Sequence, residues 1–391
     1  MKSKYISHGS YGCVFEPAQP CSTNGTKNKK TATKKALVSK VFWHASDAGV
    51  EAERSREIAS YDKDGLFTVR MYGQCPVRRN QFTSKDFQKC GRHFANRRRK
   101  LFEQIVYESG GKDLEYDEKK YSGYFGKCTF RELFHALEPI FAGLITLKRE
   151  NVVHYDIKTM NIIYNPDTKR MKLIDFGLST PLDTFYESEQ LATEVYEFYP
   201  ADASLYWAMQ TRYKQLQSIL LNHSNEEIMA SEEMIQNLQL DGLLQNYSEF
   251  TTNQQDFQRM LFEFPNKWRV DGGVLEVGRQ RYEVLNFLRA LLTTSKLMSV
   301  AARKKYIIDI FTILATRFDT YSLGIVVLEL LLAFFTADRI DLKGLELKMV
   351  VRLITSLITM NPLKRATPEK ALQSYKRIIN VLDVRDRRQI V

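Results

Sequence analysis

Two short polar segments constrain this chain more than any other part of its sequence. Residues 154–161 read His-Tyr-Asp-Ile-Lys-Thr-Met-Asn, and residues 175–177 read Asp-Phe-Gly. Two carboxylates, an amine and a carboxamide at these intervals are the groups that magnesium-assisted phosphoryl transfer requires. The sequence therefore predicts a fold in which both segments meet around one metal-bound triphosphate.

Each of the four polar side chains has an expected role. Asp156 would accept or orient the proton of a substrate hydroxyl, and Lys158 would neutralise charge on the moving phosphoryl group. Asn161 and Asp175 would supply oxygen ligands to Mg²⁺. A single Asp or Asn in a turn is usually a capping residue. Four such groups in register, between a helical pattern and the strand-like stretch 171–174, favour the catalytic interpretation.

A turn near the N-terminus predicts a phosphate-binding loop, although the signal is weaker. Gly9 and Gly12 fit the last two glycines of a G-x-G-x-x-G-x-V pattern, and Ser7 stands in the place of the first. Glycines let backbone amides approach phosphate oxygens, and Val14 would cover a purine ring. An ordinary hairpin turn is the alternative interpretation of this stretch.

Lys40 lies on a strand-like run that follows this turn, where it could reach the α and β phosphates. A lysine in that role needs a carboxylate partner, and the helical pattern at 48–61 offers Glu51, Glu53 and Glu57. Glu53 is the favoured partner because it lies one to two turns into the helix, and Glu57 is the second choice. The plainer interpretation of either residue is a solvated helix carboxylate.

These residues together resemble those of eukaryotic-type protein kinases. Residues 154–161 are similar to the H-R-D-x-K-x-x-N catalytic loop of that family, residues 175–177 to its D-F-G motif, and Lys40 to its strand lysine. The resemblance covers residues 1 to about 207 and about 316 to 380.

The resemblance implies an α+β, bilobal fold. A small antiparallel β-sheet N-lobe would occupy residues 1–108, and a mainly helical C-lobe would occupy residues 109–391, interrupted by a helical insertion at about 208–315. The family binds ATP and Mg²⁺ between two such lobes. Tyr107, in the segment that resembles the hinge, and Val38, in place of a small alanine beside adenine, would line the nucleotide site.

Two further segments extend the resemblance into the helical part. Residues 319–324 look like the buried central helix of the large lobe, and residues 361–367 look like the segment whose arginine pairs with an acid, which in this chain is assigned to Asp202. Tyr155 replaces the arginine that clamps a phosphorylated activation loop in the family. Activation by phosphorylation is therefore less expected, at any of the four candidate positions Ser179, Thr180, Thr184 and Thr193.

The resemblance also implies a function. Lys158 favours serine or threonine as the acceptor, so the expected activity is that of a serine/threonine protein kinase acting on protein substrates. The Gly-Cys-Val-Phe sequence at 12–15, the Pro-Cys pair at 20–21 and the lysine-rich tract that follows resemble kinases of large nucleocytoplasmic DNA viruses. This resemblance implies a location in host cytoplasm or virion. The rival hypothesis is a pseudokinase scaffold that binds partners through the helical insertion, which is also a candidate docking site for substrates of an active kinase.

Composition limits the other function classes. The net charge of +11 comes partly from basic clusters at 27–35 and 97–100 that carry no nucleic-acid motif, so a solvated basic face is expected and nucleic-acid binding is not. The first ten residues contain no apolar run and predict no signal peptide. The apolar run 321–335 is interrupted by Glu329 and short for a membrane span, so a buried core helix is expected.

Five scattered cysteines are an odd number, which predicts free thiols in a reducing compartment. A metal site built from Cys21, Cys75, Cys90 and His93 is the less favoured alternative, because none of their spacings is a recognised ligand pair.

Overall fold

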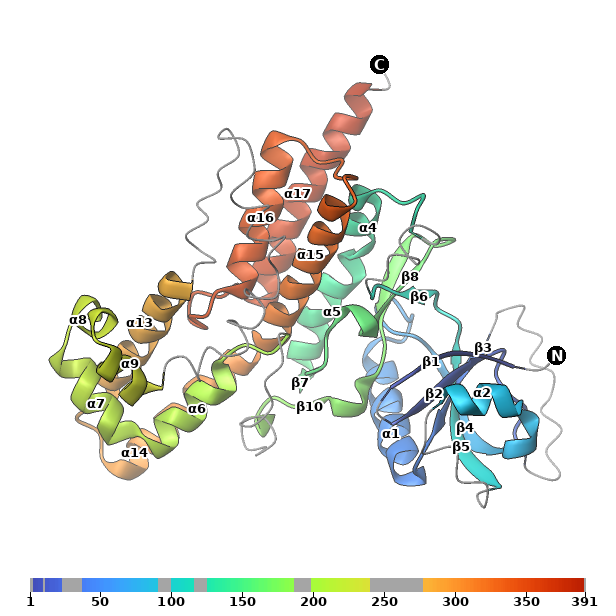
Figure 1. The fold of residues 1–391 in the computed structure, drawn as a ribbon, viewed down its shortest axis with the longest axis horizontal. Helices are drawn as coiled ribbons and strands as arrows, with labels where there is room; N and C mark the ends of the chain where they lie inside the picture. The colour runs from blue at the N-terminus through green and yellow to red at the C-terminus, as the bar shows by residue number, and fades with distance from the viewer. Residues whose placement is uncertain are drawn as a thin grey trace. The chain divides into compact units, whose positions relative to one another are not determined.

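The computed structural model describes residues 3–9, 11–22, 37–90, 100–115, 125–185, 198–239 and 277–389. The chain divides into two compact units. The sheet unit comprises residues 1–112 and 163–178, and the helical unit comprises residues 113–162 and 179–391. Figure 1 labels the helices and strands of each unit. With its strands and helices, the chain has an α+β fold.

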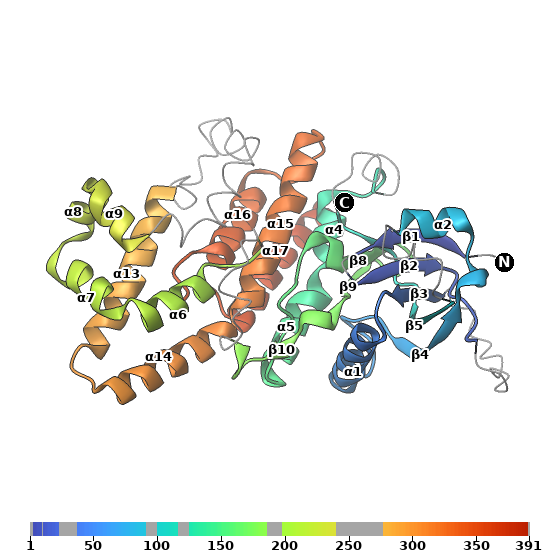
Figure 2. The same ribbon diagram turned by 60° about the horizontal axis from the view of Figure 1, so that its bottom comes forward.

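The sheet unit is built on five antiparallel strands in the order β1-β2-β3-β5-β4, visible in Figure 2. Their bounds are β1 (Lys4–His8), β2 (Gly12–Glu16), β3 (Leu37–Phe42), β4 (Met71–Arg78) and β5 (Leu101–Glu108). Smaller elements of this unit are α1 (Ala45–Tyr61), α2 (Ser84–Lys89), a 3-10 turn at Arg79–Gln81, the short strand β9 (Arg170–Leu173) and the 3-10 turn η3 (Phe176–Leu178). The strand β8 (Ile162–Asn165) precedes β9, and β6 (Lys112–Asp113) follows β5.

Two apolar clusters cover the two faces of this sheet. Successive side chains of a strand point to opposite faces, and β3 shows this alternation directly, because Val41 packs in one cluster and Phe42 in the other. The Phe42 cluster includes Ala48 and Ala52, small residues that let α1 lie close to the strands. The helix is thereby fixed against the same strand that carries Lys40.

The cysteines of the sheet unit contradict the prediction of free thiols. Disulfides join Cys13 to Cys90 and Cys21 to Cys75, with Cα–Cα distances of 5.9 and 5.6 Å, inside the range that a disulfide bridges. The partners are 77 and 54 residues apart in the chain. Pairing across such separations depends on strand order, which cysteine spacing does not reveal.

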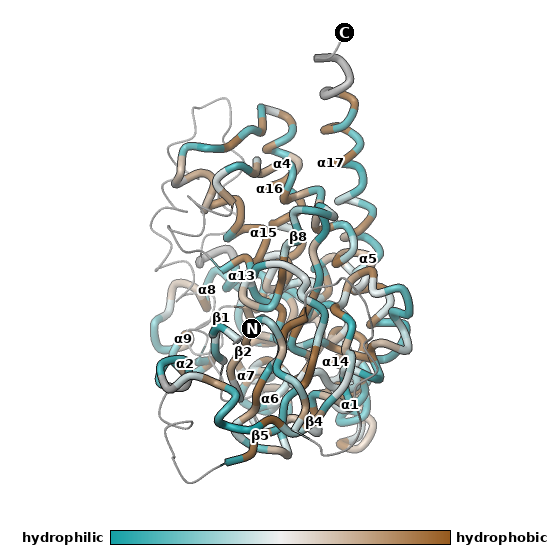
Figure 3. Tube along the Cα trace, turned by 90° about the vertical axis from the view of Figure 1, so that its right-hand side faces the viewer, coloured by the Kyte–Doolittle hydropathy of each residue, from teal (hydrophilic) through white to brown (hydrophobic). Residues whose placement is uncertain are grey.

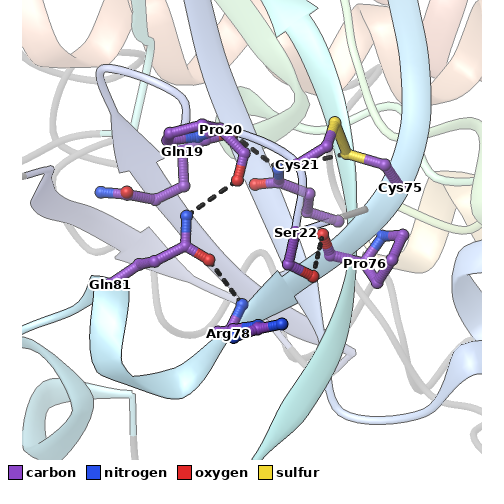
Figure 4. Close-up of a disulfide and its surroundings, with 9 residues drawn as sticks. Gln19, Pro20, Cys21, Ser22, Cys75, Pro76, Arg78 and Gln81 are labelled. Carbon is purple, nitrogen blue, oxygen red and sulfur yellow. Dashed lines mark hydrogen bonds between the residues drawn. A yellow bond between two sulfur atoms is a disulfide. The ribbon is translucent and has the colours of Figure 1, made fainter. Parts of the chain in front are cut away.

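Hydrogen bonds hold the chain around the Cys21–Cys75 disulfide (Figure 4). The Ser22 hydroxyl donates to the Pro76 carbonyl at 3.1 Å, and the Gln81 amide donates to the Pro20 carbonyl at 2.8 Å. The segment after β2 is therefore fastened to β4. The metal site considered from the sequence is not formed by these two cysteines, and His93 lies outside the described residues.

The helical unit contains most of the helices. Their bounds are α4 (Phe130–Ala136), α5 (Glu138–Arg149), α6 (Asp202–Thr211), α7 (Tyr213–Asn222), α8 (Asn225–Ala230), α9 (Glu232–Leu238), α13 (Val277–Ser295), α14 (Val300–Ala315), α15 (Phe318–Thr336), α16 (Gly344–Ile358) and α17 (Pro368–Gln389). Two short antiparallel strands, β7 (Val152–Val153) and β10 (Thr180–Pro181), lie before and after residues 154–161 in sequence. Figure 1 shows α15, α16 and α17 side by side.

The helix expected before the Asp156 loop is divided in two. Thr129 forms a capping box with Glu132 at the start of α4. The chain then breaks at Leu137, and α5 begins with Pro139 in its first turn. Because proline has no backbone N–H to donate, a helix cannot continue through it with regular hydrogen bonds.

Helix α15 forms the centre of this unit and is brown along much of its length in Figure 3. The continuous stretch Val300–Phe335 is long and apolar enough to cross a membrane by length and composition. The sequence-based expectation of a buried core helix concerned only the run 321–335, which lies inside this stretch. Of the apolar window in this stretch, 89% is buried inside the protein, as in a core helix.

Helices α6 to α9, α13 and α14 fall in or beside the region interpreted from the sequence as an insertion. The Tyr213 hydroxyl of α7 and the Ser295 hydroxyl of α13 are 2.7 Å apart, and Tyr206 of α6 packs edge-on against Phe311 of α14. Residues 240–276, which belong to the expected helical insertion, lie outside the described residues. The basic clusters at 27–35 and 97–99 also lie outside them.

Candidate functional site

In the sheet unit, Lys40 is held between two carboxylates. Its amine lies 2.5 Å from Oε2 of Glu51 and 3.0 Å from Oδ1 of Asp175. Strand β3 supplies Lys40, helix α1 supplies Glu51, and the loop after β9 supplies Asp175. The Lys40 side chain is 12% exposed and that of Glu51 only 4%, so both charges depend on each other for compensation.

The electrostatics of this cluster keep Lys40 charged. Burial alone would lower the pKa of the Lys40 amine, but the attraction of Asp175 and Glu51 outweighs burial and raises that pKa. Burial raises the pKa of the Tyr107 hydroxyl well above its usual value, and the neighbouring Glu51 adds to this effect. At neutral pH the cluster therefore contains a cationic lysine and a protonated tyrosine.

The carboxylate that contacts Lys40 is Glu51, and the preference for Glu53 was wrong. Glu51 is 3% exposed and lies on the face of α1 that also buries Ala48 and Ala52. Glu53 is two residues further on, about 200° around the helix, and its side chain is exposed. Glu57, the second choice, pairs with Arg54 at 2.8 Å.

The predicted phosphate-binding turn is the connection between β1 and β2. Ser7 pairs with Val14 across the hairpin, and the Gly9 N–H donates to the Gly12 carbonyl at 3.0 Å. A Cβ at Gly12 would lie 2.2 Å from the backbone oxygen of Val41, so β2 can approach β3 this closely only with glycine there. In the same ladder Val14 lies opposite Lys40, which places the end of the turn next to the lysine.

Val38 and Tyr107, both expected to line a nucleotide site, face each other across β3 and β5. The Tyr107 hydroxyl, however, donates to Oε1 of Glu51 at 2.9 Å and lies 3.1 Å from the Ser55 hydroxyl. The Tyr107 hydroxyl therefore contacts Glu51, the residue that pairs with Lys40. No sequence pattern indicated this contact, because it depends on how α1 is rotated about its own axis relative to β5.

In the helical unit, the segment 154–161 forms a second cluster. The Lys158 amine is 2.9 Å from the Asp156 carboxylate. The Asn161 amide nitrogen donates to both the backbone carbonyl and Oδ2 of Asp156, each at 2.8 Å. The three polar side chains expected to act together in this loop are thus in direct contact.

Asp319 at the start of α15 holds the loop in place. Its carboxylate accepts the backbone N–H of His154 at 2.7 Å and that of Tyr155 at 3.0 Å. Tyr155 has a φ of 72°, a left-handed conformation that a bulky residue rarely adopts, so the loop needs such an anchor. The sequence placed Asp319 on a buried helix but did not indicate its two partners.

The Tyr155 ring packs in an aromatic cluster inside the helical unit. It stacks on Tyr199 at 4.7 Å and meets Phe185 and Phe318 at 5.5 and 5.4 Å between ring centroids. Tyr155, which stands where the resembled family carries an arginine, therefore makes aromatic packing contacts at this position. Residues 186–197 lie outside the described residues, and the candidate phosphorylation position Thr193 is among them.

Asp202 pairs with Arg365, as the resemblance implied for these segments. Two hydrogen bonds of 2.7 and 2.9 Å join the guanidinium to the carboxylate, and both side chains are fully buried. A bidentate pair of this kind fixes orientation as well as distance.

Each cluster, taken by itself, contains an oxygen donor of the kind that binds Mg²⁺ in proteins. The nitrogen of the Asn161 amide is committed to Asp156, so the amide oxygen is the atom that can bind a cation. The Asp175 side chain is 33% exposed and offers a carboxylate, the ligand type that Mg²⁺ prefers. Asn161 belongs to the helical unit and Asp175 to the sheet unit.

Two comparisons with known proteins bear on this chain. The protein kinase domain family matches residues 104–199, which include the 154–161 loop and Asp175. A probable cell division protein kinase of Encephalitozoon cuniculi is 36% identical over 70 residues, or 18% of this chain and 25% of that protein. The similarity thus spans a quarter of that relative. These findings show similarity to protein kinases over about a quarter of this chain or less, and protein kinase domains as a class use ATP and usually Mg²⁺.

Proposed function

We propose that this protein is an active serine/threonine protein kinase that transfers the γ-phosphoryl group of Mg-ATP to hydroxyl groups of proteins. The observation that carries the proposal is the double pairing of Lys40 with Glu51 and Asp175. A buried lysine held by two carboxylates from different elements is well placed to bind phosphate oxygens. The likeness to the protein kinase domain supports the same assignment.

In this proposal the two clusters serve one nucleotide. Lys40 holds the α and β phosphates, while the turn with Ser7, Gly9 and Gly12 covers them with backbone amides. Asn161 and Asp175 hold Mg²⁺, which supplies charge neutralisation for the phosphates when it is bound.

The transfer itself is assigned to the 154–161 loop. Asp156 orients the acceptor hydroxyl and takes its proton, and Lys158, 2.9 Å from that carboxylate, neutralises charge on the transferred group. Asn161 fixes the Asp156 side chain through Oδ2. Lys158 also supports serine or threonine as the acceptor, by the resemblance to the kinase family.

The direct test incubates the purified protein with Mg²⁺, γ-labelled ATP and a set of acidic and basic protein substrates, beside an Asp156→Asn variant. Wild type should label protein on serine or threonine, and phosphoamino acid analysis would identify the residue. The variant should lose at least about 100-fold in kcat, since it lacks the proton acceptor. Equally low labelling by both would refute the enzyme proposal and favour the pseudokinase scaffold.

We further propose that the helices in 208–315 recruit protein substrates. A variant that replaces residues 213–295 by a flexible linker would retain α6, α14 and the Tyr206–Phe311 contact between them. It should phosphorylate proteins more weakly while hydrolysing ATP at the wild-type rate. Equal losses in both activities would show that these helices are only structural.

A viral origin and a location in host cytoplasm or virion are also proposals. Disulfides persist mainly in oxidising environments, so the state of Cys21 and Cys75 is informative about location. Trapping thiols during cell lysis, followed by fractionation, would reveal both where the protein resides and whether these cysteines are oxidised there.

A further inference from the structure

Tyr107 connects the central sheet to the carboxylate that pairs with Lys40. Its ring packs on the apolar cluster that includes Phe42 and Ile105. Its hydroxyl projects beyond that cluster to Glu51. The ring therefore anchors the residue, and the hydroxyl is the part that contacts a charged group.

The two oxygens of Glu51 are held from two different strands. Oε2 accepts from the Lys40 amine of β3 at 2.5 Å, and Oε1 accepts from the Tyr107 hydroxyl of β5 at 2.9 Å. A carboxylate with only one partner can rotate about its last torsion. With a donor on each oxygen, the Glu51 carboxylate is fixed in one orientation.

Ser55 fixes the direction of the Tyr107 hydroxyl. It lies one turn after Glu51 on α1, and its hydroxyl is 3.1 Å from that of Tyr107. A carboxylate can only accept, so the tyrosine donates to Glu51 and accepts from Ser55. The hydroxyl also remains protonated, since burial and the nearby Glu51 charge raise its pKa.

From this geometry we propose that Tyr107 is a positioning residue: its hydroxyl orients Glu51, and through Glu51 it orients the Lys40 amine for phosphoryl transfer. This inference rests on the proposed kinase function for its effect on the reaction. It differs from the role expected from the sequence, in which Tyr107 would only line the nucleotide site.

The two roles of Tyr107 predict different kinetics. If Tyr107 lined the nucleotide site, changing it would alter the KM for ATP and leave kcat nearly constant, because a pocket wall contributes equally to the bound substrate and the transition state. If it positions Lys40, its loss should reduce kcat, because the orientation of Lys40 matters most in the transition state.

The variant Tyr107→Phe removes only the hydroxyl and keeps the packed ring. We expect kcat to fall about 10-fold, the size of one hydrogen bond to a charged group, with the KM for ATP changed less than about threefold. Tyr61→Phe is the matched control. It removes a tyrosine hydroxyl that donates to Glu57 at 2.8 Å, on the same helix but away from Lys40. This control should retain wild-type kcat and KM.

A double-mutant cycle tests whether the hydroxyl acts through Glu51. In a Glu51→Gln background, Tyr107→Phe should change kcat by less than about twofold, because the oriented group is already absent. Thermal unfolding of each variant would identify a merely structural effect. If Tyr107→Phe lowers kcat equally in both backgrounds, or leaves it at the wild-type value, the inference is overturned.

A second readout requires no kinase activity. Acetylation of Lys40 by acetic anhydride, followed by mass spectrometry, reports how firmly its amine is held. It should be several-fold faster in Tyr107→Phe than in wild type, and unchanged in Tyr61→Phe. If wild type transfers no phosphate but this difference is present, the proposed function fails and the inference stands. Equal acetylation in Tyr107→Phe and wild type would overturn the inference even if the wild type is an active kinase.

Discussion

At the scale of single residues, Glu51 is the side chain on which the position of Lys40 depends most directly. Glu51→Gln keeps the size of the side chain but removes its charge, so the 2.5 Å contact with Lys40 becomes a neutral hydrogen bond at best. We expect kcat/KM for ATP to fall about 10- to 100-fold, from the loss of a charge-assisted interaction. Steady-state kinetics with varied ATP would measure it.

Glu53→Gln is the control for this prediction, because Glu53 lies on the exposed side of α1. Its kinetics should match wild type. If Glu53→Gln impaired activity while Glu51→Gln did not, the sequence-based preference for Glu53 would be restored and the observed pairing would have no role in catalysis.

Asp319 predicts a dependence of stability on pH. Burial raises the pKa of this carboxyl, and the nearby His154 and the two backbone N–H donors offset burial only in part. Since the folded pKa exceeds the unfolded value, the folded state binds the proton more tightly in the interval between them. Stability contributed by this group is therefore greatest below the unfolded pKa and declines as the pH rises through the folded pKa.

In Asp319→Asn this decline should disappear. The variant should also unfold about 1–3 kcal/mol more easily at low pH, because its amide NH₂ meets one of the N–H donors of the loop and leaves that donor unsatisfied. Thermal unfolding between about pH 4 and 7 would measure both effects. A wild-type protein whose stability relative to the variant rises with pH across this interval would contradict the expected decline.

The chemistry of these residues could be predicted from the sequence better than their contacts. Asp156, Lys158 and Asn161 lie within one short loop, and their proximity follows from that. Glu51 and Tyr107 come from different elements, and which of them meet depends on the rotation of α1 and the pairing of β3 with β5. Helix α1 carries glutamates at positions 51, 53 and 57, and the local sequence pattern alone does not show which of them pairs with Lys40.

At the scale of elements, the Cys21–Cys75 disulfide ties the segment after β2 to β4. Cross-linking residues 54 apart restricts the unfolded chain, and the chain-entropy relation gives a stabilisation of about 4 kcal/mol. A Cys21→Ser, Cys75→Ser double variant should therefore unfold at a clearly lower temperature than wild type. Differential scanning calorimetry with and without a thiol reductant would measure this.

Cys128→Ser provides the comparison, because the Cys128 thiol is not part of either disulfide. It should have nearly the wild-type unfolding temperature under oxidising conditions. If the double variant and the reduced wild type were as stable as the oxidised protein, the disulfide would contribute nothing to the sheet unit.

The elements themselves follow from local signals more reliably than their boundaries do. The β-branched and aromatic residues at 6–15 and 36–42 are typical of strands, and β1, β2 and β3 form there. The same approach joined α4 and α5 into one helix, because the apolar period continues through Leu137 although the backbone does not. The disulfides were missed for a different reason, since spacing along the chain contains no information on strand order.

At the scale of the whole molecule, the α+β fold could be inferred from motifs that are far apart in the sequence. The region from 208 to 315 could not be placed in this way, because helical periodicity indicates that helices form but not what they pack against. The contacts of α6 with α14 and of α7 with α13 could therefore not be predicted from the sequence. One long-range contact was nevertheless implied by the resemblance, the pair of Asp202 with Arg365.

The Asp202–Arg365 pair joins residues 163 apart inside the helical unit, and neither side chain is exposed. Replacing only Arg365 by Met should destabilise this unit by about 3–5 kcal/mol, because the Asp202 carboxylate would be left buried without its partner. Asp202→Leu should cost a similar amount, since Arg365 would remain near Arg317, whose pKa burial already lowers. The double variant should recover most of the loss, because a well-packed apolar pair removes both desolvation costs. Thermal unfolding of the four proteins would measure the coupling, and additive losses in the double variant would show that the two charges do not stabilise each other.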